Sequence, residues 1–180
     1  MASHPIDAAV RSFTAERRYS QAMVERWLRL PSADAAALLD LAQELRLGEN
    51  QLRDLWEWAE EIAERDRMSL AQVLALEPIA AARRQQLSRN DRLNLVKATL
   101  RRLRFPQLAA VENQLAARVR ELGLPGNVRL TWPEFLEGDS MQIEIVADSA
   151  AALRDAAMRL LAAAQSPACD AIFALLADAP

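Results

Sequence analysis

Residues 83–120, RRQQLSRNDRLNLVKATLRRLRFPQLAAVENQLAARVR, concentrate the positive charge of this chain. The stretch holds 10 of the 22 basic residues and two acids, so its net charge is +8 in a protein of −3. Residues 31–80 hold four basic and 11 acidic residues, a net of −7, and residues 121–180 hold three basic and nine acidic, a net of −6. A cationic segment between two anionic ones indicates an anionic partner, a neighbouring acidic segment, or both.

The same stretch sets the local fold around Pro106. Apolar residues recur every three or four positions on both sides of this proline, which predicts helices over 91–104 and 106–122. Gly123 is a natural C-terminal stop for the second of them.

Towards the N-terminus, the same spacing predicts further amphipathic helices. They cover residues 14–30, 33–45 and 49–66, followed by a short helix that starts at Ser69 and ends before Pro78. Ser32 is expected to be an N-cap. Residues 1–13 are predicted as a frayed lead-in and residues 79–90 as a polar connector.

After Gly126 the apolar pattern changes to alternation. Residues 127–132 and 142–147 are predicted strands of a β-hairpin, with Gly138-Asp139 in its turn. Helices are predicted over 149–164 and 168–177. The expected fold is mostly α with a small α+β C-terminal unit, in which a helical bundle precedes helix, β-hairpin and helix. The expected domains are 14–90 and 91–180.

The residues that usually carry enzymatic chemistry are nearly missing. Cys169 is the one cysteine, so neither an internal disulfide nor a multi-cysteine metal site is possible. His4 is the one histidine and lies at the N-terminus, which argues against a His relay or His metal site. No phosphate-binding glycine loop or hydrolase elbow occurs. We therefore expect no catalytic residue, no cofactor and no enzyme.

The helix pair across Gly48 matches a helix-turn-helix in several positions, although Arg46 stands where the turn commonly carries glycine. Its second helix presents Asn50, Gln51 and Arg53, whose side chains could contact base edges. Acidic residues of the same helix would repel phosphates, so an ordinary helical hairpin is the alternative.

The basic segment is the main candidate for contacts with DNA phosphates. Its cations before Pro106 are Arg83, Arg84, Arg89, Arg92, Lys97, Arg101, Arg102 and Arg104. The alternative is that they pair with the acidic helix 49–66, within one chain or between subunits.

The acidic residues and two of the tryptophans are interpreted as structural rather than catalytic. The acidic run from Glu57 to Asp66, and the acids Glu134, Glu137, Asp139 and Glu144 around the hairpin, are expected to be solvated rather than catalytic or metal-binding. Trp56 and Trp58 lie two positions apart, so one is predicted to be in the core and the other at the surface or an interface.

The order of these segments resembles the region that follows the nuclease-like domain in some bacterial proteins of the ParB/Spo0J-like family. The matching residues are Leu100–Pro106 (LRRLRFP), Leu124–Val128 (LPGNV) and Phe135–Asp139 (FLEGD). The family's nucleotide-binding domain is missing. The resemblance implies DNA association, related to partition or transcription, without a nucleotide switch, in a fragment or a stand-alone relative.

Two functions follow as expectations. The first is a non-enzymatic, DNA-associated protein that binds double-stranded DNA. The second is a protein–protein interaction or dimerisation module. We find no signal peptide and no run of about 18 apolar residues, and therefore expect a cytoplasmic bacterial protein, nucleoid-associated if it binds DNA, with no membrane partner.

Overall fold

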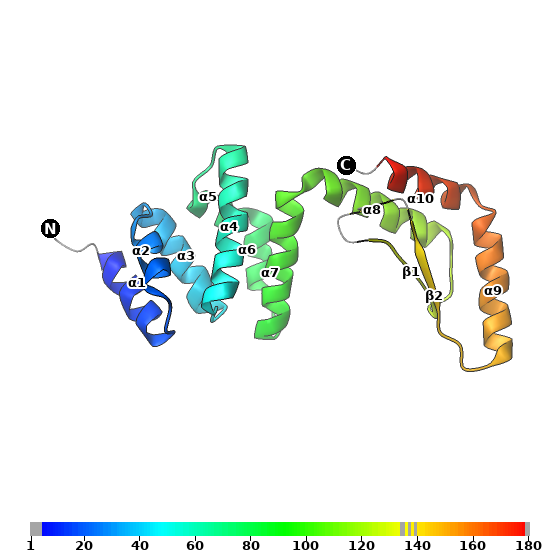
Figure 1. The fold of residues 1–180 in the computed structure, drawn as a ribbon, viewed down its shortest axis with the longest axis horizontal. Helices are drawn as coiled ribbons and strands as arrows, with labels where there is room; N and C mark the ends of the chain where they lie inside the picture. Colours follow the sequence, from blue (N-terminus) through cyan, green and yellow to red (C-terminus); the bar gives the residue numbers. More distant parts are fainter. Residues whose placement is uncertain (1–4, 134–135, 137, 139, 179–180) are drawn as a thin grey trace. The chain divides into compact units, whose positions relative to one another are not determined.

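The structure is a computed structural model that describes residues 5–133, 136, 138 and 140–178. In these residues it has ten helices and one two-stranded antiparallel hairpin near the C-terminus (Figure 1). This confirms the predicted fold class. The chain divides into two compact units, residues 1–104 and 105–180.

The first unit is a helical bundle around an apolar core. Its helices are α1 (Pro5–Glu16), α2 (Gln21–Leu28), α3 (Ser32–Glu44), α4 (Glu49–Asp66), α5 (Leu70–Leu74), α6 (Glu77–Arg84) and α7 (Arg89–Arg104). Helix α4 packs against α5 and α7, and α3 packs against α1 and α5. Trp27 and Trp56 are the largest fully buried side chains of this core, with their ring centroids 6.1 Å apart.

The N-terminal region differs from the prediction in two places. Residues 5–13, predicted as a frayed lead-in, form most of α1 and bury Val10 and Phe13. The single helix predicted over 14–30 is interrupted, because Arg18 has φ 56° and Ser20 caps a new helix. The break turns α2 back onto α1, so that both bury apolar residues in one core.

Helix α6 was also missed, since residues 79–90 were predicted as a connector. Pro78 lies in the first turn of α6, where proline is tolerated, and Ile79 and Ala82 are buried. The predicted N-cap of α3 is wrong, because Ser32 is the first residue of the helix and its side chain makes no cap hydrogen bond. The short helix predicted to begin at Ser69 is present, and Ser69 is its N-cap, with a reciprocal bond to Gln72.

Three helix junctions in this unit share one backbone conformation and hydrogen-bond pattern. Arg18, Arg46 and Arg67 each end a helix in the left-handed region, with φ of 56°, 47° and 56°. The next residue then donates its N–H to the carbonyl five positions back, at 2.9 Å in all three cases. These are Schellman-type ends. The N-cap of the following helix comes directly after, as Ser20, Gly48 and Ser69.

We expect Arg46→Gly to stabilise the first unit by about 0.5–1 kcal/mol, because glycine adopts positive φ without the steric cost of a Cβ. The hydrogen bonds that Arg46 accepts use its backbone carbonyl, which the substitution keeps. The measurement is the urea midpoint by circular dichroism. Arg46→Ala, which keeps the Cβ, is the matched control, and an equal gain from alanine would contradict the explanation.

The boundary between the two compact units lies between Arg104 and Phe105. The sequence pattern predicts a domain boundary after residue 90 instead. Helix α7 packs against α4 and α6 and buries Leu93, Val96 and Leu100 in the core of the first unit. The basic helix therefore belongs with the acidic helix α4.

The second unit combines five elements with a small core. Its elements are α8 (Pro106–Glu121), β1 (Val128–Thr131), β2 (Gln142–Ile145), α9 (Ala150–Ala164) and α10 (Pro167–Ala177). Helix α8 packs against α10, and their contact buries Leu115 and Ile172. In the hairpin, Val128 pairs with Ile145 and Leu130 with Ile143, as the alternation predicted. Most of the predicted turn, including Asp139, lies outside the described residues.

Candidate functional site

Several cations of the basic segment form ion pairs within the first unit. Lys97 lies 3.5 Å from Asp54 of α4, and Arg104 pairs with Glu61 of the same helix, with 2.9 Å between Nη2 and Oε1. These contacts are the pairing with the acidic helix that the charge pattern offered as an alternative, and they occur within one chain.

The preceding helix α6 holds two further ion pairs. Arg83 pairs with Glu44 at 2.7 Å, and both side chains are half-buried. Arg84 pairs with Glu77 at 2.6 Å in an exposed position. An exposed pair contributes about 0–1 kcal/mol, so Arg84 keeps most of its capacity to meet another anion.

Arg89 has a structural role that its charge did not reveal. Its guanidinium donates to the carbonyls of Leu45 at 2.7 Å and Arg46 at 2.9 Å, which end α3. It also donates to Gln51 Oε1 at 3.1 Å. A cation at a helix C-terminus satisfies carbonyls that have no partner in the helix. Arg89 therefore holds the α3–α4 turn.

The other three cations differ in exposure. Arg102 is exposed, whereas Arg101 and Arg92 are half-buried. The Nε of Arg92 is buried and has no hydrogen-bond partner among the described residues. Among the cations of the segment before Pro106, Arg84 and Arg102 are thus the exposed ones.

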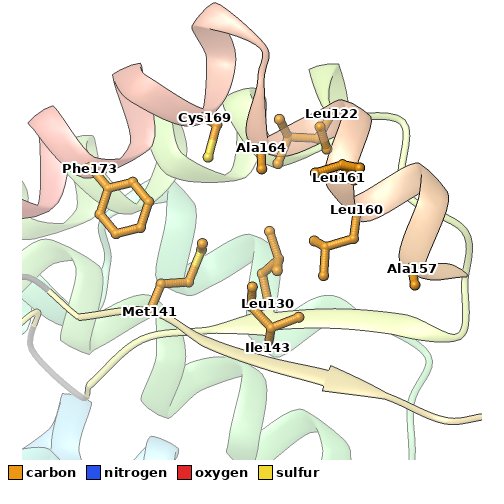
Figure 2. A pocket seen from close by; sticks show the side chains of 11 residues that line it. Leu122, Leu130, Met141, Ile143, Ala157, Leu160, Leu161, Ala164, Cys169 and Phe173 are labelled. Carbon is orange, nitrogen blue, oxygen red and sulfur yellow. The ribbon is translucent and has the colours of Figure 1, made fainter.

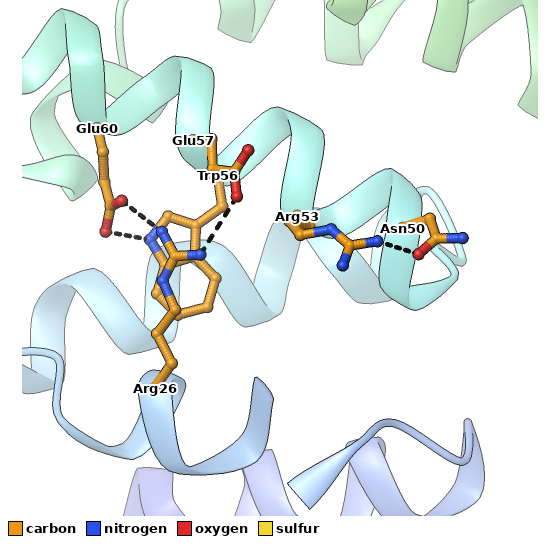
Figure 3. Close-up of polar contacts among 6 residues, drawn as sticks. All are labelled: Arg26, Asn50, Arg53, Trp56, Glu57 and Glu60. Carbon is orange, nitrogen blue, oxygen red and sulfur yellow. Dashed lines mark hydrogen bonds and ion pairs between the residues drawn. The ribbon is translucent and has the colours of Figure 1, made fainter. Parts of the chain in front are cut away.

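The three base-reading candidates of α4 differ in their contacts. Gln51 accepts a hydrogen bond from the Gly48 N–H at 3.2 Å as well as one from Arg89, so its carbonyl oxygen is engaged in the turn. Asn50 and Arg53 are exposed, and Arg53 donates to the Asn50 side chain (Figure 3).

Figure 3 also shows a cluster of side chains around Trp56 that the sequence alone does not predict. The Arg26 guanidinium lies 4.3 Å from the Trp56 ring centroid, 2.6 Å from Glu60 and 3.6 Å from Glu57. The Trp56 indole N–H donates to the other Glu60 oxygen at 2.6 Å. A cation over an indole face is favourable, and here it joins α2 to α4. Part of the acidic run is thus used in ion pairs rather than only solvated.

A second link between α2 and α4 involves Glu49. Its carboxylate accepts hydrogen bonds from the Ser20 backbone N–H and hydroxyl, both at 2.7 Å. The bond from the Ser20 side chain and that from its backbone hold the pKa of Glu49 below its ordinary value of 4.5. Nearby, burial raises the pKa of Tyr19 to about 12, and its hydroxyl donates to the Leu47 carbonyl at 2.9 Å.

Glu49→Gln is expected to lower stability slightly at neutral pH and to change the acid limb of the stability curve. A depressed carboxyl pKa contributes stability that is present above the ordinary value and is lost as pH falls below 4.5 through the folded-state pKa. The two proteins should therefore converge as the solution is acidified. Urea midpoints from pH 7 downwards measure this, and a constant difference would contradict it.

No group of three or more potential metal ligands occurs among the residues that the structure describes. Glu134, Glu137 and Asp139 lie outside those residues, so the prediction for these hairpin acids stays a prediction. Cys169 is half-buried and contributes to the wall of an apolar groove.

This groove is the main feature of the second unit, and the sequence alone does not predict it. It has a volume of about 490 Å³, and the 11 residues that line it among those that the structure describes are apolar. Figure 2 shows Leu130, Met141 and Ile143 on the hairpin side. Residues of α9, among them Leu160 and Leu161, face them.

The apolar surface extends beyond the groove. Exposed large apolar side chains of this unit are Ile143, Val146, Leu153, Met158, Leu161 and Phe173, with exposures from 41% to 66%. In α9, Ala156 and Ala163 are the buried residues. A helix with few charges that is exposed in this way indicates a surface that another apolar element covers.

In the described part of the chain, no single helix is long and apolar enough to cross a membrane. Helices α9 and α10 meet the length and composition requirement only as a pair, which is bent by 71°.

No family model, no curated protein and no solved structure matches this chain. The resemblance to the ParB/Spo0J-like region stays a prediction, and its segment Phe135–Asp139 lies largely outside the described residues.

Proposed function

We propose that this chain is a non-enzymatic protein-association module that binds an apolar helical segment along the groove of its second unit. The observation that carries the proposal is the groove itself, about 490 Å³ in volume, whose lining side chains in the described part of the chain are apolar. Because the described lining residues offer apolar side chains, the groove favours an apolar partner over a polar metabolite.

The charge balance of the two units supports association through apolar contacts. Residues 1–104 hold 17 basic and 15 acidic residues, a net of +2, and residues 105–180 hold five basic and 10 acidic, a net of −5. Neither unit carries the strong positive charge that supports tight phosphate binding. The ion pairs of Arg83, Lys97 and Arg104 further reduce the cations available for phosphate.

The test places a photo-activatable cross-linking amino acid at Leu161, which lines the groove and is 62% exposed. Ala162 is the matched control, since it is the next residue, is exposed and does not line the groove. In cells that make the full chain, we expect a discrete protein adduct from position 161 and none from 162. The partner, identified by mass spectrometry, should lose affinity for the purified Leu161→Glu variant.

Equal adducts at both positions, or none at either, would contradict the proposal. Leu161→Glu is expected to fold, because the leucine side chain is mostly exposed and its replacement leaves no cavity.

DNA association is a second proposal, supported by the exposed cations Arg53, Arg84 and Arg102 of the first unit. Fluorescence anisotropy with duplex DNA tests it. Binding through phosphates should weaken steeply as salt rises, and Arg102→Ala should weaken it further without loss of stability. If the folded protein does not bind at low salt, this proposal fails.

A further inference from the structure

Helix α9 contains the apolar repeat of a coiled-coil seam. Alanines occur seven residues apart at Ala150, Ala157 and Ala164, and leucines seven apart at Leu153 and Leu160. The alternating spacing of three and four residues places all five on one stripe of the helix. We name these five residues the Ala–Leu seam.

The Ala–Leu seam borders the apolar groove. Ala157, Leu160 and Ala164 line it, and Leu153 is 49% exposed. The ion pair between Asp155 and Arg159, at 3.1 Å, lies on the opposite side of the helix by the 3.6-residue period. The seam is therefore apolar along its whole length, with charges only towards its flanks.

We propose that the helix bound in this groove is α9 of a second copy of the chain, paired antiparallel. In this arrangement Ala157 faces the partner's Leu160, and Leu153 faces the partner's Ala164. The inference rests on the proposed function and names its partner. A twofold axis between positions 158 and 159 makes the contact the same for both copies.

The alternation of alanine and leucine decides the orientation. Antiparallel pairing puts one leucine against one alanine in each layer, so every layer has the same volume. Parallel pairing would alternate layers of two alanines with layers of two leucines, which cannot pack at one interhelical distance.

The groove decides the register. The three seam residues that line it, Ala157, Leu160 and Ala164, all lie in the contact when the axis passes between 158 and 159. An axis at position 155, half a heptad earlier, also pairs alanine with leucine, but it leaves Ala164 uncovered. Leu161 of each helix flanks the contact and adds apolar area beside the groove.

The experiment uses the full chain with Cys169→Ala, so that no native thiol interferes. One differently tagged version carries Leu153→Cys and the other Ala164→Cys, and the two are mixed and oxidised mildly. We expect a mixed disulfide as the main product. Homodimeric disulfides should be scarce, because like positions in the antiparallel pair are offset by 11 residues, or ~16 Å along the axis.

The matched control mixes Leu153→Cys with Ala162→Cys, which is exposed but lies away from the seam, and no disulfide is expected. Sedimentation velocity should show a dimer for the wild type and a monomer for Leu161→Glu. The dimer should persist from about 50 mM to about 500 mM salt, since salt screens the repulsion between two acidic units.

The other outcomes overturn the inference. A Leu153→Cys homodimer would indicate parallel pairing, and binding of the monomer to vesicles of phosphatidylcholine and phosphatidylglycerol would indicate that a membrane covers this surface. A monomer whose position 161 cross-links to a different protein would refute the second copy while keeping the proposed function. Absence of any position-specific adduct would refute both.

Discussion

Trp56→Ala should lower the free energy of unfolding of the first unit by about 3–5 kcal/mol, the largest single-residue effect that we expect in this chain. Trp56 is fully buried, and its ring contacts that of Trp27 with the centroids 6.1 Å apart. Truncation removes this packing and leaves a cavity that the surrounding helices cannot close.

The polar contacts of the indole add to that loss. Arg26 lies over the ring at 4.3 Å, and Glu60 accepts the indole N–H at 2.6 Å. Both charged side chains reach solvent, so they lose an interaction without becoming buried and unpaired. Most of the expected cost is therefore packing, with a smaller part from the cation–π contact.

Trp58→Ala is the matched control, because it removes the same side chain from the same helix. Trp58 is half-buried and packs at the edge of the core, so we expect less than half of the loss for Trp56→Ala. Urea denaturation followed by far-UV circular dichroism compares the two. Equal losses would show that burial does not separate these tryptophans as the structure indicates.

The sequence predicted most helices because apolar spacing and capping chemistry agreed. Ser69 illustrates this, because the short helix predicted to begin there does so in the structure, with Ser69 as its N-cap. The break in the first predicted helix escaped because Arg18 has a positive φ, where glycine would have marked the turn. Helix α6 escaped because Pro78 looked like a stop, although it occupies the first turn of a helix.

The candidate sites were predictable to different degrees. Charge complementarity anticipated the contacts of Lys97 and Arg104 with α4. The groove was not predictable, because the sequence shows that α9 is apolar but does not show which apolar residues the fold covers. Leu153 and Ala156 are both apolar residues of α9, yet the first is half exposed and the second is buried.

Arg89→Ala should destabilise the first unit by about 2–3 kcal/mol, whereas Arg102→Ala should change stability by no more than about 0.5 kcal/mol. Arg89 donates to two carbonyls at the end of α3 and to Gln51, so its removal leaves acceptors of the α3–α4 turn without partners. Arg102 is exposed. Urea midpoints at equal m-values compare the two variants, each of which removes one positive charge from α7.

Arg89→Lys extends the comparison because it keeps the charge. A lysine ammonium cannot reproduce the planar fork that reaches both carbonyls, so the variant should remain destabilised by at least about half as much as Arg89→Ala. If full stability returned with lysine, net charge rather than hydrogen-bond geometry would explain the role of this position. Part of the positive charge of residues 83–104 is therefore used in ion pairs and hydrogen bonds that hold the helices of the first unit together. The exposed cations remain as candidates for contacts with a nucleic acid, and Arg102→Ala tests them in the DNA-binding experiment.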